Sequence, residues 1–92
     1  RPAAPRTSSS RARWDRATRA EKDYLRAMAH DGEGPSQVGE LARRMGRKAG
    51  SLSPARQSLI RKGLIYAPEH GKIAFTVPNM ARFISRQPRE TQ

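Results

Sequence analysis

Two glycines, Gly46 and Gly63, constrain the fold most because each one ends an apolar pattern with the period of a helix. The residues before Gly46 repeat at i, i+3, i+4 and i+7, the spacing of one buried helix face: Val38, Leu41, Ala42 and Met45. A second stripe lies between the glycines: Leu52, Ala55 and Leu59. Glycine ends a helix readily because it adopts the left-handed conformation at little cost. The pattern therefore predicts two short helices joined by a turn that begins at Gly46.

After Gly63 the period of the apolar pattern changes to two. Residues 64–67 and 73–77 are rich in β-branched and aromatic side chains, and Pro68-Glu69-His70-Gly71 separates them. This pattern predicts a β-hairpin with a loop of about four or five residues. Apolar residues then return at helical spacing and predict a short closing helix over about 79–86: Met80, Phe83 and Ile84.

The first helix of the domain is predicted over about residues 19–30. Thr18 and Glu21 have the spacing of a capping box, and Tyr24 and Met28 continue the apolar face. Upstream, residues 1–17 hold five arginines and one bulky apolar residue, Trp14, and predict a disordered basic linker. Trp14 is expected to dock back onto the domain rather than stack on a nucleobase. Residues 87–92 are predicted to be a disordered tail.

The expected domain, residues 18–86, is mainly α with a small β-hairpin, an α+β fold of order helix-helix-helix-strand-strand-helix. Two helices joined by a short glycine-containing turn, with a hairpin directly after them, are typical of a winged helix-turn-helix. In that architecture the last helix of the pair enters the major groove of DNA. Because the chain starts at Arg1, we expect it to be part of a longer protein.

The positive charge is concentrated in two stretches of the chain. The net charge is +11, of which residues 1–17 hold +4 and residues 43–62 hold +7. The stretch 43–62 has no acidic residue and seven basic ones: Arg43, Arg44, Arg47, Lys48, Arg56, Arg61 and Lys62. Since the rest of the chain is neutral, this placement indicates a docking face for a polyanion, most often nucleic acid.

The candidate DNA-binding residues lie in the turn, the third helix and the hairpin: Arg47, Lys48, Ser51, Ser53, Gln57, Ser58, Arg61, Lys62 and Lys72. Arg47 and Lys48 precede the third helix and suit phosphates, although solvation alone also explains them. Gln57 and Arg61 are one turn apart on the outward face, where Gln suits adenine and Arg suits guanine.

For four of the candidates the case for DNA contact is weaker, or a structural role also explains the residue. Ser51 or Ser53 is expected to cap the third helix, and that role alone would explain both serines. Ser58 shares the outward face marginally, and Lys72 lies near the hairpin turn, where Glu69 dilutes its charge.

Three other basic residues are expected to be structural. Arg56 falls on the inward stripe and therefore needs a buried partner, for which Glu40 or Glu21 is expected. Arg43 and Arg44 end the second helix, where cations favour the helix dipole with or without a ligand.

The residue inventory argues against catalysis. The chain has no cysteine and two histidines far apart, so no metal cluster and no thiol nucleophile is expected. A phosphate loop and a nucleophile elbow are also missing from the sequence. No cofactor, signal peptide or membrane span is expected, and the predicted location is cytoplasmic, with the nucleoid if DNA is bound.

The hairpin carries a resemblance to a known family. Residues 59–78, LIRKGLIYAPEHGKIAFTVP, resemble the end of the C-terminal winged-helix domain of certain bacterial AAA-type ATP-binding proteins. These proteins are similar in turn to archaeal origin-recognition ATPases, whose winged-helix domain binds duplex DNA. The resemblance covers about residues 18–86 and implies an ATPase core before this chain.

Two functions follow from these patterns. The first is non-catalytic binding of double-stranded DNA by an accessory domain of an ATPase. The alternative is a protein-interaction or regulatory winged helix that packs on its own ATPase core or on a partner, because fold does not fix function.

Overall fold

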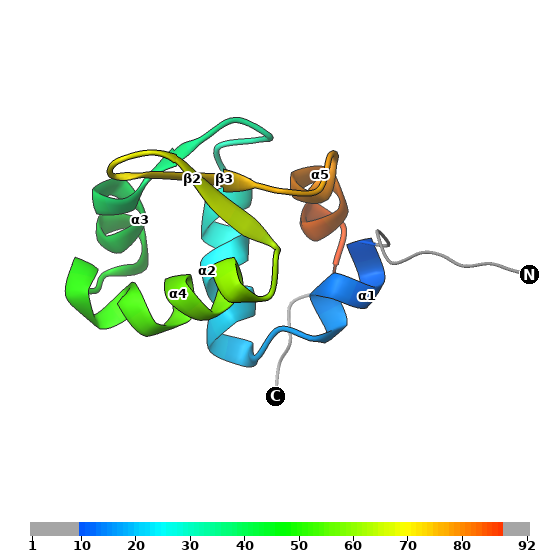
Figure 1. Cartoon of the computed structure of the whole chain (residues 1–92), viewed down its shortest axis with the longest axis horizontal. Coiled ribbons are helices and arrows are strands. Elements are labelled where there is room, and N and C mark those ends of the chain that lie inside the picture. Colours follow the sequence, from blue (N-terminus) through cyan, green and yellow to red (C-terminus); the bar gives the residue numbers. More distant parts are fainter. Residues whose placement is uncertain (1–9, 88–92) are drawn as a thin grey trace, which may run out of the picture.

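The computed structural model describes residues 10–87 and shows an α+β domain (Figure 1). The elements in chain order are α1 (Ser10–Asp15), α2 (Arg19–Ala29), β1 (Ser36–Gln37), α3 (Val38–Met45), the 3-10 helix η1 (Ala49–Leu52), α4 (Ser53–Arg61), β2 (Ile65–Glu69), β3 (Lys72–Phe75) and α5 (Met80–Ser85). In Figure 1, α2 runs through the middle, with α3 to its left and α1 and α5 to its right. The helices pack with one small three-stranded antiparallel sheet.

Helix α2 begins with the predicted capping box. Thr18 Oγ1 accepts a hydrogen bond from the Glu21 N–H at 3.2 Å, and Glu21 Oε1 accepts one from the Thr18 N–H at 3.0 Å. Each side chain thus satisfies a backbone donor that the helix itself leaves free. Behind the cap, Tyr24 and Met28 are fully buried, so this prediction of a helix and its inner face is confirmed.

Helix α3 ends at Gly46 in the left-handed conformation (φ 68°), as predicted. The predicted serine cap of the next helix is wrong. The chain winds through η1 directly into α4, and Leu52 precedes α4 without a side-chain cap. The Ser53 N–H bonds to the Gly50 carbonyl, so the preceding 3-10 turn already occupies the donor that the Ser51 hydroxyl would have capped. The Ser53 hydroxyl instead accepts a hydrogen bond from Arg56 Nη2.

The hairpin turn is tighter than predicted. Strand β2 extends through Pro68 and Glu69, so only His70 and Gly71 (φ 81°) separate it from β3. The pairing of β2 with β3 shifts register between Tyr66 and Glu69, which accommodates a proline that cannot donate to the ladder.

A third strand, β1, completes the sheet on the other side of β3. Ser36 pairs with Ile73 and Gln37 with Lys72, which makes the strand order β1-β3-β2. From the sequence, only a short extended segment before α3 could be suggested. Its pairing with β3 is a finding of the structure.

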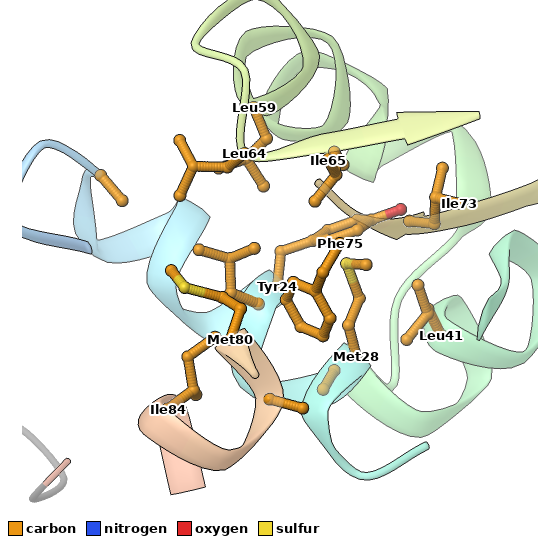
Figure 2. Packing of buried hydrophobic residues seen from close by; sticks show 14 of the residues in the cluster. Tyr24, Met28, Leu41, Leu59, Leu64, Ile65, Ile73, Phe75, Met80 and Ile84 are labelled. Atoms are coloured by element: carbon orange, nitrogen blue, oxygen red, sulfur yellow. The ribbon is translucent and has the colours of Figure 1, made fainter. Parts of the chain in front are cut away.

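One hydrophobic core joins the helices to the inner face of the sheet (Figure 2). Its labelled members come from α2, α3, α4, the hairpin and α5: Tyr24, Met28, Leu41, Leu59, Leu64, Ile65, Ile73, Phe75, Met80 and Ile84. All of them are less than 10% exposed, with Phe75 the most exposed at 8%. Burial of this apolar surface is the main force that holds such short helices together.

The ordered chain begins earlier than predicted, because residues 10–17 are structured rather than a disordered linker. Trp14 in α1 is only 5% exposed and meets the Phe83 ring edge-on, with 6.5 Å between the ring centroids. Arg13 Nη1 also donates to the Gly63 carbonyl at 3.2 Å. Docking of Trp14 onto the domain is thus confirmed. The rest of the predicted linker, residues 1–9, and the tail beyond Gln87 lie outside the described residues.

Candidate nucleic-acid interface

The turn after α3 presents two cations to solvent. Arg47 and Lys48 follow Gly46 directly, and both are exposed. Ser51 is exposed as well, but its hydroxyl donates to the Lys48 carbonyl at 2.8 Å. The turn therefore offers charge at two side chains, while Ser51 is bonded back to the Lys48 backbone.

Helix α4 has a buried inner face and an exposed outer face. Leu59 is fully buried, whereas Gln57 and Arg61, one turn apart, are exposed. Ser53 and Ser58 are half-buried at the margin of the outer face. The structure thus brings the two predicted base-reading residues onto one exposed surface.

Arg56 does not have the partner that we predicted. Its Nη2 donates to Ser53 Oγ at 3.2 Å, while its Nη1 is buried with no hydrogen-bond partner among residues 10–87. Glu40 instead pairs with Arg43 at 3.5 Å, on the same helix. Burial raises the pKa of the Tyr24 hydroxyl, and the Arg56 guanidinium beside it opposes this rise. Arg56 thus faces the core without an acidic partner.

Lys62, a predicted DNA contact, is engaged within the domain. Its Nζ lies 2.7 Å from Glu21 Oε1 and also donates to the Arg16 carbonyl at 3.0 Å. Burial raises the pKa of Glu21, but hydrogen bonds from Lys62, Ser58 and the Thr18 N–H outweigh it and hold that pKa below its usual value. Glu21 is therefore the acid that pairs with this segment, through Lys62 and not through Arg56.

The hairpin turn carries little free positive charge. Lys72 is half-buried at the start of β3, and its Nζ lies 3.9 Å from Glu69 Oε1. His70 is exposed between the strands.

A concentration of cations that the sequence analysis missed lies between α2 and the end of α3. We call it the basic groove, an open hollow of about 360 Å³ lined by Arg19, Lys22, Asp23, Arg26, Ala27, His30, Arg44, Met45 and Arg47. Four basic residues recur at i, i+3, i+7 and i+11 and so lie along one helix face: Arg19, Lys22 and Arg26 on α2 and His30 directly after it. That spacing was visible in the sequence. Its significance was not, because the charges of all residues outside 1–17 and 43–62 sum to zero, which hid the cations of α2.

One wall of the basic groove is fixed by Arg44. Its guanidinium binds the Asp31 carboxylate through two hydrogen bonds of 3.1 and 3.2 Å and the Ala27 carbonyl through one of 2.7 Å. Hydrogen bonding with Arg44, and then with Ser36, lowers the pKa of Asp31.

Within residues 10–87 no group of His, Cys, Asp or Glu side chains is arranged to hold a metal ion. In the same part of the chain, every helix is too short or too polar to cross a membrane.

The fold and its exposed cations define a small α+β domain with basic surfaces on α4 and on α2. The chain belongs to the family described as Domain of unknown function (DUF8462), whose model matches residues 8–84. No curated protein and no solved structure matches the chain. The family match includes α1, in agreement with the packing of Trp14 into the core.

Proposed function

We propose that this chain is a non-catalytic winged-helix domain that binds double-stranded DNA with α4 in the major groove. The order of α2, α3, α4 and the β2–β3 hairpin supports this proposal, since a winged helix-turn-helix has the same succession. The observation that carries it is the exposure of Arg47, Lys48 and Arg61 on the turn and α4, within a segment (residues 43–62) that has no acid.

Each part of the surface has its own role in this proposal. Arg47 and Lys48 contact phosphates, which fix the position of the domain on the duplex. Gln57 and Arg61 reach base edges, where their side chains can form bidentate hydrogen bonds. Lys72 contacts the DNA backbone beside the hairpin. Lys62 adds positive charge, but its ammonium stays paired with Glu21.

The proposal also says which kind of larger protein the domain belongs to. We infer from the resemblance of residues 59–78 that it is a C-terminal accessory domain of an AAA-type ATPase. That part of the proposal rests on the resemblance alone, and the DNA-binding part rests on the charged surface.

Binding of a labelled duplex at several salt concentrations tests the function. If about four to six phosphates are neutralised, log affinity should fall with log salt at a slope of about −4 to −5. Arg47→Ala should weaken binding to all sequences alike, whereas Gln57→Ala should change the base preference. Binding that is undetectable or insensitive to salt would reject the proposal.

A protein-interaction domain is the second candidate, and one observation favours it. Tyr66 on β2 is 49% exposed, and it is the one large hydrophobic residue within 10–87 that is classed as exposed. Exposed aromatic residues are enriched at protein interfaces. A chemical-shift map with the parent ATPase core, compared with one with DNA, discriminates: shifts at Tyr66 only with the core favour this alternative.

A further inference from the structure

The basic groove is a second cationic surface, formed by α2 rather than by α4. Arg19, Asp23 and His30 are exposed along α2, and Lys22 and Arg26 are half-buried between them. At a rise of about 1.5 Å per residue, the stripe from Arg19 to His30 is roughly 16 Å long. One strand of DNA presents a phosphate about every 3.4 Å along the helix axis, so the stripe is long enough to follow several phosphates.

The lining of the groove has more positive than negative side chains. Its lining includes five Lys or Arg side chains and one carboxylate, that of Asp23. Asp31 neutralises Arg44. Two other carboxylates near these helices are also engaged, since Glu21 pairs with Lys62 and Glu40 with Arg43. Like charges held this close repel one another, and a bound anion would relieve that repulsion.

Two cations of the groove are held in place by an aromatic ring. Lys22 Nζ lies 5.3 Å and the Arg26 guanidinium 5.1 Å from the centre of the Trp14 ring. Such contacts position both side chains before any ligand arrives, which lowers the entropy cost of binding. The packing of α1 therefore shapes the groove as well as the core.

We infer that the basic groove is a second phosphate-binding site, separate from α4, that takes the backbone phosphates of nucleic acid. Arg47 lines the groove and also belongs to the turn before α4, so a nucleic acid can contact both surfaces around this residue. The site shares its class of ligand with the proposed function, but it does not require α4 to enter the major groove.

Opposite charge changes within the groove test this inference on the 92-residue chain. We expect Arg19→Gln to weaken the binding of a short fluorescein-labelled duplex by about three- to tenfold and to reduce the salt slope by about one. Asp23→Asn should strengthen binding by about two- to threefold, because it removes the carboxylate that opposes the phosphates.

The matched controls make the same changes in net charge at residues that do not line the groove. Arg82→Gln on α5 and Asp15→Asn on α1 should alter affinity by less than about twofold if placement and not total charge decides. Circular dichroism of every variant checks that the fold is kept.

The outcomes separate this inference from the proposed function, which Arg61→Gln tests. Weaker binding by Arg19→Gln with tighter binding by Asp23→Asn supports the groove, whatever Arg61→Gln does. If both groove variants match their controls while Arg61→Gln loses affinity, the groove is rejected and the proposed function stands. If the unsubstituted chain binds no duplex, both are rejected.

Discussion

Lys62 Nζ lies 2.7 Å from Glu21 Oε1, so the residue after α4 is bound to the residue that caps α2. The same oxygen accepts the Thr18 N–H at 3.0 Å. Lys62 also donates to the carbonyl of Arg16, between α1 and α2. Through this ion pair and this hydrogen bond, Lys62 connects the end of α4 to α2 and to the segment between α1 and α2. A residue that the charge pattern assigned to DNA therefore supports the fold.

Removing the charge of Glu21 should destabilise the domain. Glu21→Gln keeps the capping box, which accepts either residue, but leaves Lys62 without its carboxylate. We expect a loss of about 1–2 kcal/mol in the free energy of unfolding near neutral pH. This is less than for a fully buried pair, because 33% of the Lys62 side chain is exposed. Urea unfolding measures the loss, and Glu40→Gln, at an exposed pair, is the control.

The same pair should make stability depend on pH. The pKa of Glu21 is lowered in the folded chain, so its stabilisation is complete above the ordinary value of 4.5 and is lost as the pH falls through the folded value. The free energy of unfolding, measured from neutral to acidic pH, should therefore fall more for the unsubstituted chain than for Glu21→Gln. Parallel pH profiles would contradict this account.

Replacement of Trp14 tests whether α1 belongs to the domain. Trp14→Ala removes a buried ring that contacts Phe83 and should cost about 3–5 kcal/mol, enough to unfold a small domain in part. Trp14→Phe should lose less and remain folded. Arg11→Ala, at an exposed position of the same helix, is the control and should change little. Equal denaturation midpoints for all of these chains would show that α1 contributes nothing.

Substitution at Gly46 should reveal the left-handed turn that joins α3 to η1. Gly46 has φ 68°, where a Cβ costs about 1–2 kcal/mol, and Asn tolerates this region better than Ala. We expect Gly46→Ala to lower the melting temperature by roughly 4–16 °C and Gly46→Asn by less. Gly50→Ala is the control, because its φ is not positive and its added Cβ would meet open space. A similar loss at both glycines would point away from backbone conformation as the cause.

The hydroxyl of Tyr24 should contribute no stability. It is buried beside the Arg56 guanidinium but makes no hydrogen bond of good geometry among residues 10–87, so its removal spares a desolvation cost. We expect Tyr24→Phe to leave the free energy of unfolding unchanged or to raise it by up to about 1 kcal/mol. Tyr66→Phe, at an exposed position, gives the baseline. A clear loss in Tyr24→Phe would mean that the hydroxyl is bonded in solution.

Local patterns identified most of the elements. The capping box at Thr18 and the helix that ends at Gly46 were both predictable, because each depends on neighbours along the chain. Strand β1 was not, since Ser36 and Gln37 have no apolar alternation and pair only with a strand far along the sequence. Helix α1 was missed because the composition of residues 1–17 as a whole outweighed the one large side chain that is buried there.

The amount of charge and the short segments that form helices can be read from the sequence, because both properties are local. The residues outside 1–17 and 43–62 are neutral as a sum. Packing of the helices separates these charges in space: Glu21 pairs with Lys62, while Arg19 and Lys22 line the basic groove. Net charge adds along a chain, but the potential that a ligand meets depends on distances, and helix packing sets those distances.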